Sequence, residues 1–227
     1  MANLSPNRRD AFKLMAAGLA GMATTLPATA AAPPVPETGQ QALDLLMQGN
    51  QRYLAQQLTS CSANFAQLRK EYEDHQVPFA TILSCADSRV PAELVFDQTL
   101  GQLFVVRVAG NIATPDTIAS LEYSAAAVHV KLILVVGHTN CGAIKATSEN
   151  KPVPGQVSTL FQYMSPAVKG VPDLNEASRR NALLQAETLR DASPVLSELV
   201  AARKLLIKSA IYDVASGKVR LLDTNPS

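Results

Sequence analysis

Short apolar runs alternate with amphipathic stretches along the chain from about residue 40 onward. Apolar runs of strand length occur at 79–84, 103–108 and 132–136. Helices are predicted at 40–58, 63–75, 91–96, 114–128, 140–148, 173–191 and 194–202. Two further strand-like runs, 205–213 and 218–222, are separated by Ala-Ser-Gly and predict a terminal hairpin.

Details within these segments support the assignment. The first helix carries Leu43, Leu46, Met47 and Leu54 at helical spacing, with Gly49 as a weak point. In the helix at 114–128, Thr114 is placed as the N-cap, with proline at the first helical position.

The order of these elements predicts the fold class. The run 132–136 is almost entirely leucine and β-branched residues, as expected of a central parallel strand buried on both faces. Strands alternate with helices through short connections, which favours an α/β fold. We therefore expect a mostly parallel central β-sheet flanked by helices, with an N-terminal helical arm and a terminal hairpin that adds an antiparallel strand.

The N-terminus has the pattern of an export signal. Arg8, Arg9 and Lys13 precede a weakly apolar stretch at 14–26, and Ala28-Thr29-Ala30 fits a small-residue cleavage site. The paired arginines favour the twin-arginine route. We expect a signal peptide at 1–30, a Pro-rich linker at 31–39, a single domain at 40–227 and a periplasmic protein. The alternative is a retained N-terminus and a cytoplasmic protein.

Composition narrows the function classes. The chain has 227 residues and a formal net charge of +1, which gives no basic patch for nucleic acid and no acidic tail for a charged partner. No apolar run reaches the roughly 18–20 residues that span a membrane, so we expect no span in the mature protein. Three cysteines make a poor disulfide framework in a chain of this size.

Two of these cysteines and one histidine predict a metal site. Cys85 follows the strand at 79–84, and His138 and Cys141 follow the strand at 132–136. Ligands bind at the carboxyl ends of parallel strands, where these side chains should converge. Two thiolates and an imidazole select zinc, and three protein ligands leave the fourth position open, as in catalytic sites. Cys61, His75 and His129 lack ligand-like placement, and Cys61 is assigned no function.

Asp87 and Arg89 lie two and four residues after Cys85. A zinc ion lowers the pKa of bound water and gives hydroxide near neutral pH. The Asp87 carboxylate is suited to accept a hydrogen bond from that hydroxide and aim it, and Arg89 is suited to anchor the carboxylate. The alternative is a local ion pair that caps the next helix, and both roles can hold together.

These residues resemble a known family. C-A-D-S-R at 85–89 and H-T-N-C-G at 138–142 look like the two zinc motifs of β-class carbonic anhydrases, and the resemblance continues through 93–111 and 120–146. It implies that Cys85, His138 and Cys141 hold one Zn²⁺ per subunit and that Asp87 and Arg89 are the catalytic dyad. It further implies hydration of CO2 to bicarbonate and a proton, in a homodimer or a higher assembly of dimers.

The resemblance also extends to the substrate pocket. Gln76, Phe104 and Tyr123 match the plant-like, open-site members, and Gly142 is counted with them. In a closed state of other members, the dyad aspartate, here Asp87, becomes a fourth zinc ligand. Val108 departs from the family pattern, since many members carry Asn there.

Three other functions stay open. The same zinc hydroxide could attack carbonyl sulfide or carbon disulfide. The chain could instead be a non-catalytic homologue that binds zinc or bicarbonate. A redox disulfide between Cys85 and Cys141 is a third reading, although it leaves the neighbouring Asp, Arg and His without a purpose.

Overall fold

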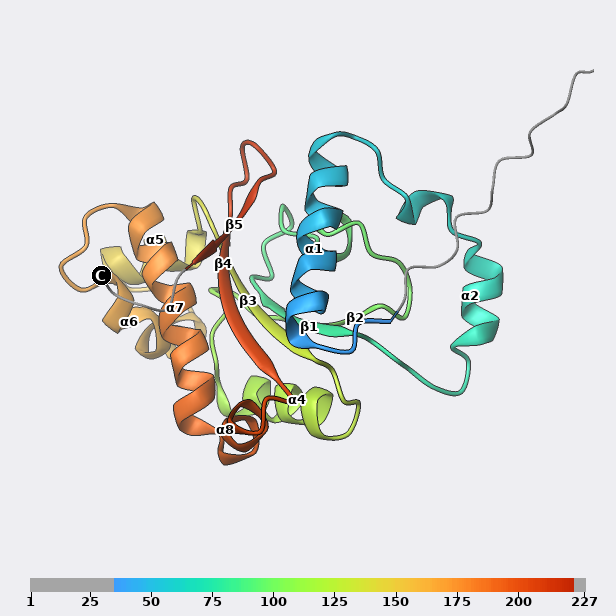
Figure 1. The fold of residues 1–227 in the computed structure, drawn as a ribbon. Helices are drawn as coiled ribbons and strands as arrows, with labels where there is room; N and C mark the ends of the chain where they lie inside the picture. The colour runs from blue at the N-terminus through green and yellow to red at the C-terminus, as the bar shows by residue number, and fades with distance from the viewer. Residues whose placement is uncertain (1–34, 223–227) are drawn as a thin grey trace, which may run out of the picture. The chain divides into compact units, whose positions relative to one another are not determined.

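A computed structural model describes residues 35–222 of the chain. The signal peptide expected at 1–30 and residues 31–34 of the linker expected at 31–39 lie outside the described residues. Figure 1 shows the elements in order, coloured along the chain.

Five strands form one sheet in the order β2-β1-β3-β4-β5. The strands are β1 (Ala80–Ser84), β2 (Leu103–Arg107), β3 (Leu132–His138), β4 (Leu206–Tyr212) and β5 (Val219–Leu222). Strands β1 to β4 are parallel to one another, and β5 pairs antiparallel with β4. The expected mostly parallel sheet with an antiparallel terminal hairpin is therefore confirmed.

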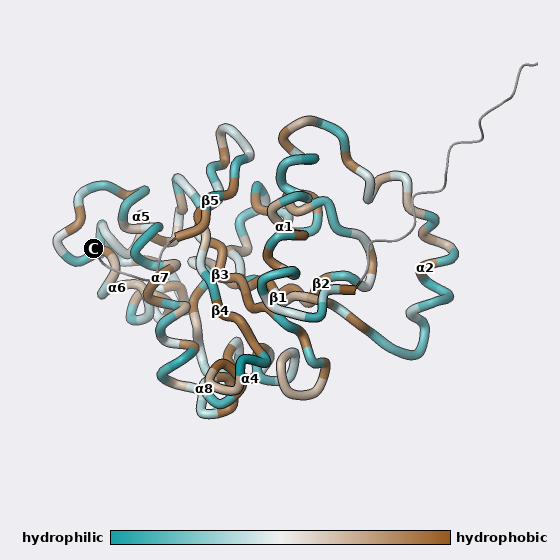
Figure 2. The backbone as a smooth tube through the Cα atoms, in the orientation of Figure 1, coloured by the Kyte–Doolittle hydropathy of each residue, from teal (hydrophilic) through white to brown (hydrophobic). Residues whose placement is uncertain are grey.

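The sheet is covered on both faces, and β3 shows this most clearly. Its residues are all buried and alternate between two cores. Leu132, Leu134 and Val136 pack in a core shared with helix α1 (Gly39–Leu54). Ile133 and Val135 pack in a second core. That second core is shared with α4 (Pro115–Ala126), α7 (Leu174–Ala192) and α8 (Pro194–Ala201). Figure 2 shows the apolar strands at the centre of these layers.

The helix starts follow their local sequence. Thr38 and Thr114 each form a capping box at α1 and α4, and Pro115 occupies the first turn of α4 as predicted. The remaining helices are α2 (Phe65–Glu71), α3 (Ala92–Val95), α5 (Gly142–Glu149) and α6 (Phe161–Val168), with 3-10 turns at Ser60–Ser62 and Val157–Leu160. Among residues 35–222, no helix has the length and apolar content needed to cross a membrane.

The N-terminal helices differ in how they pack. Helix α1 buries Leu43 and Leu46 against the sheet, whereas no residue of α2 is buried. In Figure 1, α2 lies apart from the sheet at the end of two long connections. Of the two N-terminal helices, only α2 extends away from the sheet as the expected helical arm would.

Two local findings differ from the sequence analysis. Helix α6 was not predicted, because Pro166 inside it breaks the pattern that marks a helix. Gly49 does not weaken α1, as the sequence suggested, but lies where the helix packs closely against the backbone of Phe96. A Cβ there would lie 1.8 Å from the Phe96 carbonyl oxygen, so only glycine lets α1 approach this closely.

Candidate metal centre

Cys85, His138 and Cys141 meet at the carboxyl ends of β1 and β3. All three are buried, and their ligand atoms lie within 4.8 Å of one another. The register explains the meeting, because Ser84, the last residue of β1, pairs with Val136, two residues before His138. Cys85 and His138 thus leave neighbouring strands at nearly the same level. The convergence expected from the parallel strands is what the structure has.

The imidazole of His138 is oriented toward this cluster. Its Nδ1 lies 3.0 Å from the Thr139 carbonyl oxygen, which can only accept a hydrogen bond. The hydrogen therefore belongs on Nδ1, and Nε2 keeps a free lone pair. Nε2 is buried and has no hydrogen-bond partner among residues 35–222. A buried lone pair next to two thiol groups fits a soft divalent metal such as zinc.

A left-handed residue turns the chain from His138 to Cys141. Asn140 has φ of +54°, which asparagine tolerates better than most residues. Its N–H donates to Asn175 Oδ1 at the start of α7, 3.0 Å away. Cys141 then becomes the N-cap of α5. The nearby backbone N–H groups of Ile144 and Ala143 act to lower the pKa of its thiol.

The two thiols have opposite acidities in this arrangement. The contact with the Cys141 thiol, together with the N–H of Gly110, lowers the pKa of Cys85 despite burial. The same contact with Cys85, together with burial, raises the pKa of Cys141. The proton shared in this contact therefore favours Cys141, and a metal cation bound to both sulfurs would displace it.

Asp87 and Arg89 form a two-pronged ion pair beside the cluster. Arg89 Nε donates to Asp87 Oδ1 at 2.9 Å, and Nη2 donates to Oδ2 at 2.8 Å. The hydrogen bonds from the Arg89 side chain hold the pKa of the Asp87 carboxyl well below its usual range. Asp87 Oδ2 lies 3.9 Å from His138 Nε2, so an ionised carboxylate faces the metal ligands.

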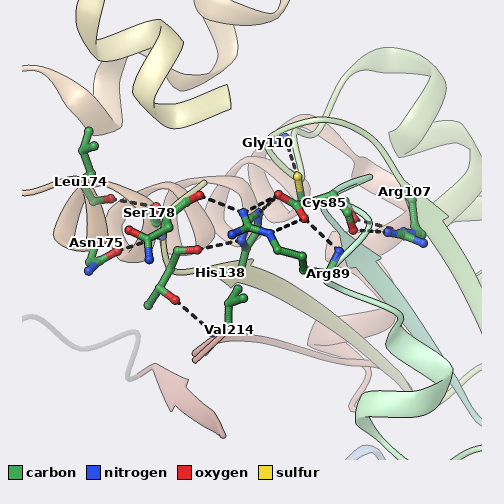
Figure 3. Close-up of polar contacts among 12 residues, drawn as sticks. Cys85, Arg89, Arg107, Gly110, His138, Leu174, Asn175, Ser178 and Val214 are labelled. Atoms are coloured by element: carbon green, nitrogen blue, oxygen red, sulfur yellow. Dashed lines mark hydrogen bonds and ion pairs between the residues drawn. The ribbon is translucent and has the colours of Figure 1, made fainter. Parts of the chain in front are cut away.

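Arg89 also joins the two motifs. Its Nη2 donates to the Asn140 carbonyl oxygen at 3.1 Å. Figure 3 shows Arg89 beside Cys85 and His138, with Asn175 on the other side of His138. One guanidinium thus binds the carboxylate after β1 and the backbone after β3.

Two residues that shape the first motif were missed by the sequence analysis. Arg107, at the end of β2, donates from Nε to the Cys85 carbonyl oxygen at 3.1 Å and from Nη2 to the Asp87 carbonyl oxygen at 2.6 Å. Gly110 donates its N–H to Cys85 Sγ at 3.3 Å. Their position in the sequence was the available signal: Arg107 ends β2 and Gly110 follows it, and β2 is the strand next to β1.

The structure brings three of the four expected pocket residues together, away from the cluster. Gln76 and Tyr123 line an open pocket of about 550 Å³, together with His75 and His129. Phe104 lies with its ring 6.2 Å from that of Tyr123. Phe104 pairs with Thr81, four residues before Cys85, so it stands roughly 13 Å along the strands from the ligands.

Gly142 and Cys61 lie elsewhere. Gly142 is the first residue of α5, and a Cβ there would meet no atom within 4 Å. Open space therefore adjoins Cys141. Cys61 is exposed in the Ser60–Ser62 turn and takes no part in the cluster.

Comparison with known proteins gives consistent matches. The family model described as carbonic anhydrase matches residues 80–219. A curated relative, carbonic anhydrase 2 of Mycobacterium tuberculosis strain CDC 1551, is 33% identical over 187 residues, covering 78% of this chain and 90% of the relative. The matched region contains both motifs and strands β1 to β4 in full.

Solved structures share the fold. The β-carbonic anhydrase CafA of Aspergillus fumigatus aligns with a TM-score of 0.64 at 25% identity, covering 82% of this chain and 93% of that one. Tetrameric β-carbonic anhydrases from Sordaria macrospora include a chain with a TM-score of 0.63 at 22% identity, covering 80% and 96%.

Proposed function

Because the chain belongs to the β-class carbonic anhydrases, and so hydrates CO2, we propose that it does so on a zinc ion held by Cys85, His138 and Cys141. The reaction is the reversible conversion of CO2 and water to bicarbonate and a proton. The observation that carries this proposal is the meeting of three buried ligand atoms within 4.8 Å, with the Asp87 carboxylate beside them.

The donor set supports zinc and an open coordination position. Two sulfurs and one imidazole nitrogen are the ligands of known catalytic sites with a fourth position left for water or substrate. When bound, zinc supplies acidified water, which is the source of a nucleophile near neutral pH. No fourth Cys or His lies with the three among residues 35–222.

We further propose that Asp87 orients the attacking oxygen. Its low pKa keeps the carboxylate ionised across the neutral range, so it can only accept hydrogen bonds. Arg89 takes both lone pairs of Oδ1, through its Nε and its backbone N–H, and one lone pair of Oδ2 through Nη2. The other lone pair of Oδ2, the oxygen 3.9 Å from His138 Nε2, stays free. A nucleophile that donates its hydrogen to Asp87 must turn its oxygen lone pair away, toward the carbon of CO2. Arg89 fixes this geometry as the positioning partner.

We propose that the active form is a homodimer or a higher assembly of dimers. The Sordaria macrospora structures are described as tetrameric, and β2 is an edge strand of the described sheet with one side unpaired. Tyr123 is 52% exposed although it is a large aromatic residue. Gln76, Phe104 and Tyr123 lie away from the cluster of their own chain, which places them suitably for a subunit boundary. Light scattering on the purified protein measures the assembly, and a monomer at micromolar concentration contradicts it.

We also propose export to the periplasm, supported by the Arg-Arg pair, the apolar stretch and the Ala28-Thr29-Ala30 site. Cell fractionation followed by N-terminal sequencing tests this directly. A protein that starts at Met1 and stays in the cytoplasm contradicts it.

The decisive experiment measures zinc content and CO2 hydration together, in the wild type and in two variants. Wild-type protein is expected to hold one zinc per chain and to be active. Cys141→Ser is expected to lose zinc, and Asp87→Ala to keep zinc but lose most activity. A wild type that holds zinc without hydrating CO2 at any pH up to about 9, the value for aqueous zinc-bound water, overturns the proposal. In that case, hydrolysis of carbonyl sulfide or carbon disulfide is assayed next.

A further inference from the structure

Two buried amide side chains on α7 carry a hydrogen-bond network that leads to Cys85. Asn181 and Gln185 have exposed fractions of 0% and 1%. Asn181 Nδ2 donates to the Gly110 carbonyl oxygen at 2.8 Å, and Gln185 Nε2 donates to Asn181 Oδ1 at 3.0 Å. Gln185 also binds the backbone, accepting from Ala113 N–H and donating to the Tyr163 carbonyl oxygen. Asn181 is therefore held on both sides.

Gly110 connects this network to the metal ligand. Its N–H donates to Cys85 Sγ, while its carbonyl accepts from Asn181. The Asn111 N–H donates to the Val108 carbonyl oxygen, which closes a turn with Gly110 in the third position. Gly110 has φ of +79°, the conformation that glycine supplies in a type II turn. A Cβ there would lie 2.3 Å from Met164 Sδ, so no other residue fits.

The direction of the Gly110 N–H depends on this turn. The two common β-turn types differ by rotation of the central peptide, which would replace the N–H facing Cys85 with a carbonyl oxygen. Asn181 anchors the carbonyl of Gly110, one peptide further along the turn, and so fixes the position of Gly110 relative to α7 and to Cys85. A buried carbonyl without that donor would cost free energy and would relax by moving the turn.

We propose that Asn181 is a positioning residue for the metal ligand: it holds the Val108–Asn111 turn so that the Gly110 N–H donates to the Cys85 thiolate. Two thiolates give a bound zinc ion much negative charge and weaken its pull on water. An N–H bond to one sulfur withdraws part of that charge. The inference rests on the proposed zinc site and assigns one of its outer contacts to a helix distant in sequence.

The test compares Asn181→Leu with Asn50→Leu. Asn50 is a matched control because it is also fully buried and binds backbone groups, namely the carbonyls of Val95 and Gly217 and the N–H of Val219. It lies in α1, in the other core, away from the metal ligands. Both variants remove a buried amide of the same size, so both should lower thermal stability. Only Asn181→Leu should alter the metal centre.

Two readouts separate positioning from stability. Zinc affinity, measured by competition with a colorimetric chelator, should fall about 10–100-fold in Asn181→Leu and stay at the wild-type value in Asn50→Leu. In the Co²⁺-substituted proteins, the sulfur-to-cobalt charge-transfer band should move to lower energy only in Asn181→Leu, because its thiolate is richer in electrons. If Asn181→Leu does not fold, Gln185→Leu, which removes the side chain that holds Asn181, should change both readouts in the same direction.

The outcomes are distinct. Wild-type zinc affinity and an unmoved band in Asn181→Leu overturn this inference and leave the zinc site intact. An equal change in Asn50→Leu also overturns it, because general destabilisation would then suffice. Wild-type protein that binds neither Zn²⁺ nor Co²⁺ overturns the proposed zinc site and this inference together.

Discussion

Residues 35–222 contain two aspartate–arginine ion pairs that have the same charges but differ in sequence separation, burial and hydrogen bonding. Asp87 and Arg89 are two residues apart and partly exposed, with exposed side-chain fractions of 19% and 47%. Asp97 is buried at 0% and pairs with Arg52, 45 residues earlier in α1. The first pair is local and faces the metal ligands. The second fastens the N-terminal helix to the rest of the chain.

Their hydrogen bonds explain the different roles. Asp97 accepts from Arg52, from the Thr59 N–H and hydroxyl, and from the Ser60 N–H, so its lone pairs are used by the protein. Burial alone would raise the pKa of Asp97, but the bonds from Arg52 and Ser60 hold it well below its usual range. The pKa of Asp87 is also well below its usual range, but one lone pair of its Oδ2 stays free. A low carboxylate pKa therefore indicates a functional site only when a carboxylate oxygen can still accept another hydrogen bond.

The largest expected effect is on catalysis. Asp87→Asn keeps the shape but replaces an acceptor oxygen with a donor, so the attacking oxygen loses its orienting contact. We expect kcat/KM for CO2 hydration to fall about 10²–10⁴-fold. Because exposed pairs contribute little to stability, Tm should change by less than about 4 °C. Stopped-flow assays and thermal unfolding of zinc-loaded protein measure both, and activity within a few-fold of wild type would exclude the orienting role.

Asp97→Asn should show the opposite pattern. It leaves Arg52, whose side chain is 30% exposed, without its charge partner, and it puts an amide where the Thr59 and Ser60 N–H groups donate. We expect a loss of about 1–3 kcal/mol in the free energy of unfolding. The activity of the folded, zinc-loaded variant should match the wild type, because Asp97 does not face the ligands. Urea unfolding at pH 7 measures the loss, and a change below about 1 kcal/mol would show that the pair does not fasten α1.

The pH dependence of this difference has a definite sign. Asp97 has a folded-state pKa below its unfolded value, so its contribution is fully present above the unfolded pKa of about 4. It is lost as the pH falls through the folded pKa. The stability gap between wild type and Asp97→Asn should therefore be constant from pH 8 to 5 and narrow in more acidic buffers. A gap that widens as the pH falls contradicts the assignment.

A comparable effect is expected one turn before Arg52. Gly49→Ala places a Cβ against the Phe96 carbonyl oxygen, next to Asp97, and α1 must move away to fit it. We expect a loss of about 1–3 kcal/mol in unfolding free energy. Gly142→Ala is the comparison, since a Cβ there meets nothing within 4 Å and the position is helical. If the two variants lose the same stability, the close packing of α1 against Phe96 is not the cause of the loss at Gly49.

The smallest effect is expected for Arg89→Lys. Lysine keeps the charge but cannot form the two-pronged contact, so the pKa of Asp87 should rise toward its usual value. Activity should then begin to fall at a higher pH on the acidic side of the pH–rate profile. If activity falls at the same acidic pH as in the wild type, the two-pronged contact between Arg89 and Asp87 adds nothing beyond the positive charge.

The sequence predicted the parts of the site that follow strand ends. Cys85 and His138 come directly after or at the end of buried runs, and parallel pairing requires such residues to meet. The family motifs added the dyad and the pocket residues. Whether Gln76, Phe104 and Tyr123 serve the substrate stays a prediction.

The outer contacts could not be predicted in the same way. Arg107 and Asn181 bind backbone carbonyls, and a carbonyl carries no residue-specific signal in a sequence. Gly49 looked unfavourable because helix propensity counts its flexibility and ignores the neighbour that it touches. Helix α6 escaped notice because its internal proline opposes the pattern by which helices are recognised.

The separation of the ligands along the chain has a consequence for folding. Cys85 and Cys141 are 56 positions apart (141 − 85) and come from strands that pair only in the folded sheet. A metal ion held by both is a cross-link, and closing a loop of that length removes about 4 kcal/mol of chain entropy from the unfolded state. His138 and Cys141 can meet within one short turn, so the ion has a local half-site before the sheet forms. Cys85 can reach such an ion only after β1 has paired with β3. Binding of the metal by all three residues would therefore report that the central strands have paired.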